Sequence, residues 1–137
     1  MLDDSDLGWA AGMIDGDGCV SVSRAVESRP NRTGVYYAVH LYVLNTTRPI
    51  LLKLQGLFGG RIVQMHPGLA TKETWQWGIH GREAQAVLAV LESYLVAKRA
   101  QAQVACIFPV GQAGRRRSAC LELGQVIGYL AMRRLNG

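Results

Sequence analysis

The hydrophobic pattern changes its period several times along the chain, and the order of these periods constrains the fold most strongly. Residues 19–26 and 35–44 alternate apolar and polar side chains, which indicates two strands that each have one wet face. The polar stretch between them contains Pro, Asn and Gly, so it predicts a turn and a long antiparallel hairpin. Residues 61–65 and 74–80 flank a Pro-Gly turn and predict a second, shorter hairpin.

Apolar residues at helical spacing lie before, between and after these hairpins. Asp6 can cap the first helix, and Pro49 is a favourable first residue for the second. The order of elements predicts an α+β fold with one antiparallel sheet of four strands and with helices on one face. At 137 residues, we expect a single domain over 1–137. The predicted helices cover 6–14, 49–58, 82–95, 96–108 and about 121–135.

Composition limits the class of protein and its partners. No segment is long and apolar enough for a membrane span, and the acidic N-terminus does not resemble a signal peptide, so we expect a cytoplasmic protein with no membrane partner. The net charge of +5 favours a polyanionic partner without proving one. The basic residues are 12 Arg and 3 Lys, a usage typical of a GC-rich bacterial or phage genome.

The three cysteines support neither a disulfide framework nor a zinc site. Cys19, Cys106 and Cys120 are odd in number, far apart and without histidine partners at ligand spacing. We expect three reduced, buried thiols.

Glycines at spacing four are the anomaly of the first helix. Gly8 and Gly12 fall on one helical stripe and Gly16 at its C-terminal end, and each costs up to about 1 kcal/mol of helix propensity relative to Ala. Small residues at this spacing allow a second backbone to approach closely. A weak helix in a loop is the alternative reading.

The segment over 10–18, AAGMIDGDG, resembles the LAGLIDADG signature of the homing endonucleases, with six of nine positions identical. The order of strands and helices after it matches the αββαββα core of that family, so the resemblance covers nearly the whole chain. Two further segments are similar to the family in the same order along the chain. Residues 45–62 resemble the end of the family's second strand, its middle helix and its third strand. Residues 94–102 resemble the segment that carries the family's active-site lysine. A single motif in a short chain resembles the homodimeric branch. The resemblance therefore implies a curved sheet, and a dimer in which two motif helices pack together.

Asp17 is the candidate catalytic and metal-binding residue. Cutting a phosphodiester needs an activated water and relief of charge on the leaving oxygen, which divalent ions held by hard oxygen ligands supply. The carboxylate of Asp17 and the carbonyl of Gly16, at the end of the first helix, can provide such ligands. We expect Asp15 to have a structural role near the dimer axis instead.

Two other catalytic candidates come from the resemblance. Lys98 is placed near the scissile phosphate, where it can orient water or stabilise charge, although a solvated side chain is the alternative. Asn45 stands where the family more often has Gln, and an Asn that caps the next segment is an equal interpretation. An EF-hand calcium loop is excluded at 15–18, because Cys19 stands where its third acid belongs.

The wet faces of the strands are the candidate DNA surface, because a twisted antiparallel ribbon can present alternate side chains to base edges in the major groove. Trp75, Trp77 and Ile79 are then expected on the opposite, covered face. The arginine run at 115–117 is either a solvated loop or a phosphate anchor. The three histidines share no metal-binding spacing. The predicted DNA-binding residues are Ser21, Ser23, Glu27, Arg29, Tyr36, His40, Tyr42, Arg61, Gln76, Arg115, Arg116 and Arg117, and the predicted dimer interface comprises Gly8, Ala11, Gly12 and Asp15.

Together, these observations predict a site-specific double-strand DNA endonuclease that acts as a homodimer on a long pseudo-palindromic site. We expect Mg²⁺ as the cofactor, with Mn²⁺ as a substitute and with Ca²⁺ binding but supporting cleavage poorly. The resemblance implies short 3′ overhangs and the spread of an intron or intein. An RNA maturase, or a DNA-binding regulator with the same fold and no cleavage, is the alternative.

Overall fold

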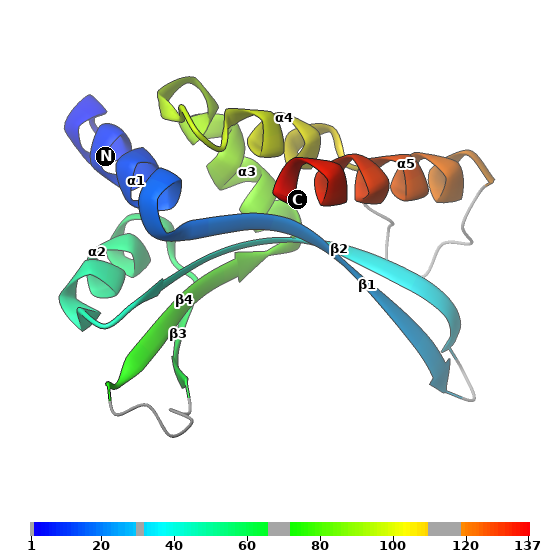
Figure 1. The fold of residues 1–137 in the computed structure, drawn as a ribbon, viewed down its shortest axis with the longest axis horizontal. Helices are drawn as coiled ribbons and strands as arrows, with labels where there is room; N and C mark the ends of the chain where they lie inside the picture. The colour runs from blue at the N-terminus through cyan, green and yellow to red at the C-terminus, as the bar shows by residue number, and fades with distance from the viewer. Residues whose placement is uncertain (1, 30–31, 66–71, 110–118) are drawn as a thin grey trace.

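The computed structural model describes residues 2–29, 32–65, 72–109 and 119–137, and the side chains of Glu27, Arg29, Arg32 and Thr33 are not described. Four strands form one antiparallel sheet in the order β1-β2-β4-β3, and Figure 1 shows it as an arch with the helices above it. The predicted α+β fold is confirmed. The elements are α1 (Asp4–Asp17), β1 (Gly18–Arg29), β2 (Arg32–Asn45), α2 (Arg48–Phe58), β3 (Arg61–Met65), β4 (Thr74–His80), α3 (Gly81–Leu91), the 3-10 helix η1 (Glu92–Tyr94), α4 (Arg99–Ile107) and α5 (Ala119–Asn136).

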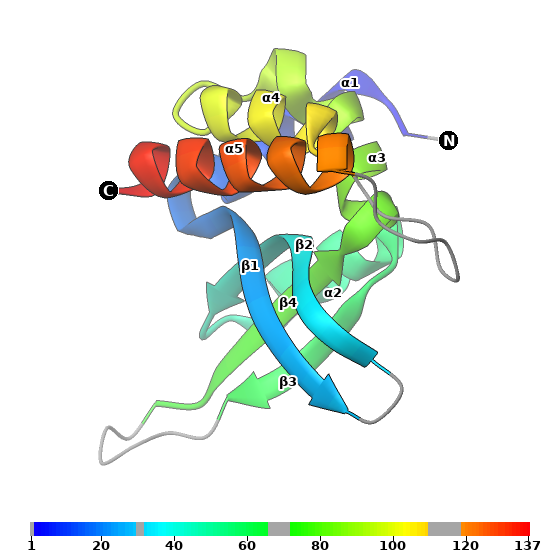
Figure 2. The ribbon, with the colours of Figure 1, turned by 90° about the vertical axis from the view of Figure 1, so that its right-hand side faces the viewer.

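The strand β2 holds the sheet together, because it pairs with β1 along its full length and with β4 near its end. Alternate side chains of the strands point toward the helices and form the core, including the predicted Trp77 and Ile79, while Trp75 is half-buried against it. The β1–β2 hairpin curves away from α5 (Figure 1). Val26, in the outer part of β1, is 68% exposed. None of the described helices lies on the other face of the sheet, and we call it the open face (Figures 1 and 2).

The first helix is longer than the sequence predicted. It begins at Asp4 and ends at Asp17, and Asp3, not Asp6, caps it by accepting the backbone N–H of Asp6 at 2.8 Å. The sequence offers several acids that can each cap a helix, so the prediction chose the wrong one. At the other end, a Cβ on Gly18 would lie 2.7 Å from the backbone of Ile14, so the sharp passage from helix to strand requires glycine there.

The C-terminal half also differs in detail from the prediction. The helix expected over 82–95 ends earlier, at Leu91, and η1 and an extended Leu95 separate it from α4. The last helix packs closely on the chain before it, because a Cβ on Gly128 would lie 2.6 Å from the ring of Phe108. In the described part of the chain, no helix is long and apolar enough to cross a membrane.

The three cysteines are unpaired, but the expectation that they are buried is wrong. Cys120 is exposed, and Cys19 and Cys106 are half-buried. Cys19 lies on the open face, whereas Cys120 is in the first turn of α5.

Candidate functional site

Asp17 is the last residue of α1, and its side chain is exposed at the point where the helix gives way to β1. Its position follows from the packing of the helix, because Ala10, Ala11 and Ile14 are buried in the core and anchor α1 against the sheet. The next residue, Gly18, pairs with Val43 of β2. The carboxylate therefore stands at the edge of the sheet, and it is positioned by a helix whose inner side is anchored in the core and by a paired strand.

Asn45 holds one oxygen of this carboxylate. Its Nδ2 donates to Asp17 Oδ2 at 3.1 Å, while its Oδ1 accepts the backbone N–H of Thr47 at 2.8 Å. The second bond fixes which end of the amide faces Asp17, because only the oxygen can accept from an N–H. Asn45 therefore caps the segment before α2, as one interpretation of the sequence expected, and it also contacts Asp17.

Asp15 and Lys98 tie the end of α1 to the chain before α4. The Asp15 carboxylate accepts the backbone N–H groups of Val96 and Lys98 at 2.8 and 3.0 Å. In return, Lys98 Nζ donates to the backbone carbonyl of Asp15 at 3.0 Å. The half-buried Lys98 thus has its ammonium group at the backbone of Asp15, two residues before Asp17 in the sequence.

The end of α1 offers oxygen ligands that suit a hard divalent ion. The last four carbonyls of a helix lack partners within it. Here the carbonyl of Ile14 accepts from Gly18 and that of Asp15 from Lys98, which leaves those of Gly16 and Asp17 as candidates. The described residues contain no group of three or more His, Cys, Asp or Glu that could hold an ion. Among the described residues, Asp17 and the helix-end carbonyls of Gly16 and Asp17 are therefore the candidate ligands at this end of α1.

The outer side of α1 carries the glycine stripe. Gly8, Gly12 and Gly16 are exposed, and a Cβ on any of them would meet no atom within 4 Å. The stripe is therefore open to a second backbone. Ala11, in contrast, is 1% exposed and belongs to the core of its own chain, so its assignment to the dimer interface is wrong.

The open face gathers most of the predicted DNA-binding side chains. Strand alternation and register place there residues from all four strands: Ser21, Ser23, Tyr36, His40, Tyr42, Arg61 and Gln76. Glu27 and Arg29 lie in β1, but their side chains are not described, and the arginines at 115–117 and His66 lie outside the described residues.

A pair of histidines on this face was not predicted from the sequence, because their contact depends on strand register. His40 and His80 are direct partners of β2 and β4, with ring centroids 6.0 Å apart. Ser23 Oγ lies 2.9 Å from His40 Nε2. Burial lowers the pKa of His40 below its usual value, and the charge of His80 lowers it further.

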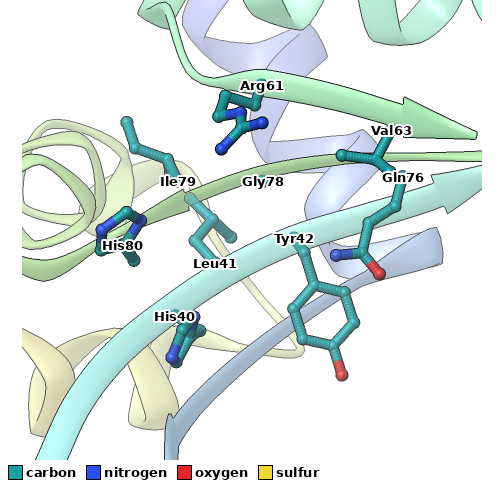
Figure 3. Close-up of a pocket in the computed structure, with 9 residues that line it drawn as sticks. All are labelled: His40, Leu41, Tyr42, Arg61, Val63, Gln76, Gly78, Ile79 and His80. Carbon is teal, nitrogen blue, oxygen red and sulfur yellow. The ribbon is translucent and has the colours of Figure 1, made fainter.

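These histidines border a hollow of about 250 Å³ on the open face. Figure 3 shows Arg61, Gln76 and Tyr42 around its other sides, with Gly78 between them. At its rim near β1, a hydrogen bond with Cys19 raises the pKa of Tyr42. The described residues that line the hollow include cationic, amide, imidazole and hydroxyl groups beside apolar side chains, and none of them is a carboxylate. This chemistry favours an anionic or hydrogen-bonding partner.

Comparison with protein-family models and with curated proteins found no match. Solved structures do match over nearly the whole chain. The homing endonuclease I-CvuI in complex with the I-CreI target is 21% identical, with 98% of this chain and 99% of that chain covered and a TM-score of 0.66. I-TnaI is 17% identical over 95% and 92% of the two chains, with a TM-score of 0.63. The archaeal intron-encoded I-Vdi141I complexed with DNA is 14% identical over 98% and 99%, with a TM-score of 0.60. The chain therefore has the LAGLIDADG homing endonuclease fold.

Proposed function

We propose that this protein is a site-specific double-strand DNA endonuclease that acts as a homodimer with a divalent metal ion. The observation that carries the proposal is the exposed carboxylate of Asp17, held by Asn45 and neighboured by Lys98, at the edge of an open, strand-built face. Structures with the same fold are described as complexes with DNA targets, one of them in the presence of Mg and another of Ca. The net charge of +5 suits a polyanion.

In this proposal, Asp17 and the carbonyl of Gly16 hold the ion. A divalent ion there supplies the charge that activates a water molecule and offsets negative charge on the leaving oxygen. Asn45 orients the carboxylate by donating to its Oδ2, and Oδ1 is the proposed ligand of the ion. Lys98, fixed by its bond to Asp15, stabilises negative charge on the phosphate. Mg²⁺ is the proposed cofactor, Mn²⁺ its substitute, and Ca²⁺ fills the site with little cleavage.

The proposal of a homodimer follows from the incompleteness of one chain. A duplex has two strands to cut, and one chain carries a single Asp17 at the end of a single motif helix. Two copies related by a two-fold axis present two such sites, and a pseudo-palindromic target mirrors that symmetry. The exposed stripe of Gly8, Gly12 and Gly16 lets the two α1 helices approach each other closely.

The test is a search for cleavage on randomised double-stranded DNA. The purified protein is incubated with the library and Mg²⁺, and the new double-strand ends are sequenced, with EDTA and Ca²⁺ reactions as controls. We expect ends that cluster at one sequence and appear only with Mg²⁺ or Mn²⁺. Recovery of bound DNA without any Mg²⁺-dependent ends would instead support a DNA-binding regulator, and recovery of neither would contradict the proposal.

A further inference from the structure

The open face near the hollow is organised in rows that run across three strands. Strand register places Tyr42 opposite Gly78 and Gly78 opposite Arg61, and we call this the glycine row. Two residues further along β2, Leu44 lies opposite Gln76, which lies opposite Val63 of β3; these form the glutamine row. Figure 3 shows Gln76 beside Val63, with Arg61 on the other side of Gly78.

The glycine row presents hydrogen-bond donors around an empty centre. Gly78 has no side chain, and the hollow of about 250 Å³ lies over it, with the exposed Arg61 at its edge. Within the described part of the chain, no carboxylate forms an ion pair with Arg61. A guanidinium offers five donors in a fixed fork and no acceptor, so it suits a partner with two neighbouring acceptors. In the major groove, the O6 and N7 atoms of guanine are such a pair.

The glutamine row has a different chemistry. Gln76 carries both a donor and an acceptor, and on either side of it lie apolar side chains that remain open to solvent, Leu44 at 38% and Val63 at 49% exposure. An amide can bond the N6 and N7 atoms of adenine in a bidentate manner, and apolar side chains can contact the methyl group of thymine. An amide between two exposed apolar side chains therefore matches both members of an A·T pair.

The spacing of the rows matches the spacing of bases. The rows are two residues apart along each strand, or about 6.8 Å, and each base pair of B-DNA occupies about 3.4 Å. Accordingly, we infer that the open face reads a guanine through Arg61 over Gly78 and, about two base pairs away, an A·T pair through Gln76 flanked by Leu44 and Val63. This inference deepens the proposed function and rests on it, because it assigns the bases that the DNA-binding face selects.

The experiment is a binding selection from randomised double-stranded DNA, in Ca²⁺ so that bound sites stay intact. For the wild type, we expect each half-site to contain a guanine and an A·T pair separated by about two positions. Arg61→Gln should lose the guanine preference, and Gln76→Glu should replace the A·T preference with C·G, since a carboxylate accepts from the N4 of cytosine. Each change should alter discrimination at its own position by roughly 5- to 150-fold and leave the other position unchanged.

Arg134→Gln is the matched control for the loss of one charge, because Arg134 is exposed on α5, on the helix side of the sheet. At most, this variant should bind DNA with lower affinity, and it should keep both base preferences. Enrichment of a defined site whose base preferences are the same for the wild type, Arg61→Gln and Gln76→Glu would overturn the inference while leaving DNA binding intact. Failure of the wild type to enrich any sequence would contradict the proposed function itself.

Discussion

Replacing Asp15 by Ala should destabilise the fold, because this carboxylate joins α1 to the segment before α4. It accepts the backbone N–H groups of Val96 and Lys98 at 2.8 and 3.0 Å, across more than 80 residues of sequence. The substitution removes both acceptors and leaves two donors without a partner in the chain. Asp15→Asn keeps one oxygen but turns an NH₂ group toward the second donor, so it should lose one bond only.

The magnitude follows from the kind of bond and its exposure. A hydrogen bond to a charged group contributes about 1.5–3 kcal/mol. Val96 is 82% exposed, so water replaces the carboxylate at its N–H and that bond contributes less. We therefore expect a loss of about 2 kcal/mol in unfolding free energy for Asp15→Ala and about 1 kcal/mol for Asp15→Asn. An unfolding entropy of about 2.1 cal/mol/K per residue gives about 0.29 kcal/mol/K for 137 residues, so about 2 kcal/mol lowers Tm by about 7 °C.

Urea titrations at one fixed protein concentration measure this loss, because the stability of a dimer depends on concentration. Lys98→Met is the comparison: it removes the charge and a single bond from a half-buried side chain, so it should change stability by less than about 1 kcal/mol while slowing cleavage. If Asp15→Ala unfolds at the same urea concentration as the wild type, the carboxylate does not hold α1 in place and the structural role assigned to it is wrong.

Three further predictions concern other parts of the molecule. Gly12→Leu should weaken self-association by roughly tenfold or more, because it adds bulk to the glycine stripe, and an unchanged mass in light scattering would exclude that interface. Gly18→Ala should lower the unfolding free energy, measured by urea titration, by about 1–3 kcal/mol, because its Cβ would overlap the preceding helical turn. Gly56→Ala is the control: it lies within a helix and its Cβ would enter open space, so it should leave stability unchanged or raise it. Burial and His80 lower the pKa of His40, so the unfolded chain binds more protons than the folded chain just below pH 6.5. The stability of the wild type should therefore fall as the pH drops through that range. In thermal melts between pH 7.5 and 5.5, the stability of His40→Gln should fall less than that of the wild type.

The alternation of apolar and polar residues was sufficient to predict the sheet. It assigned Trp77 and Ile79 to the covered face, and both are at most 5% exposed. Helix boundaries were predicted less well, because Asp3, Asp4 and Asp6 are all competent caps and sequence alone does not choose among them. The break after Leu91 likewise has no Gly or Pro to mark it.

The contacts of the candidate site could not be derived from local patterns. Asn45 meets Asp17 across 28 residues and Asp15 meets Lys98 across 83, and both contacts require the relative placement of elements that are far apart in sequence. The resemblance pointed to Asp17, Asn45 and Lys98 as catalytic candidates, but the hydrogen bonds of these residues became known only from the structure. The pairing of His40 with His80 also depends on the register of β2 and β4. Ala11 was assigned to the wrong side of α1, because this helix carries small residues both on its outer side and on its core-facing side, and residue size alone does not distinguish the two.

Substitution of Asp17 by Asn tests the central claim most directly, with gel shift and cleavage measured together on the selected DNA site in Mg²⁺. The variant keeps the shape and hydrogen-bonding capacity of the side chain and removes the charge that holds the ion. Asp6→Asn is the matched control on the same helix, since its 3.8 Å ion pair with Lys53 is partly exposed to solvent and contributes little. We expect Asp17→Asn to bind DNA as the wild type does and to cleave it at least about a hundredfold more slowly, with Asp6→Asn unchanged in both assays. Cleavage by Asp17→Asn at the wild-type rate would contradict the assignment of Asp17 as the metal-binding catalytic residue.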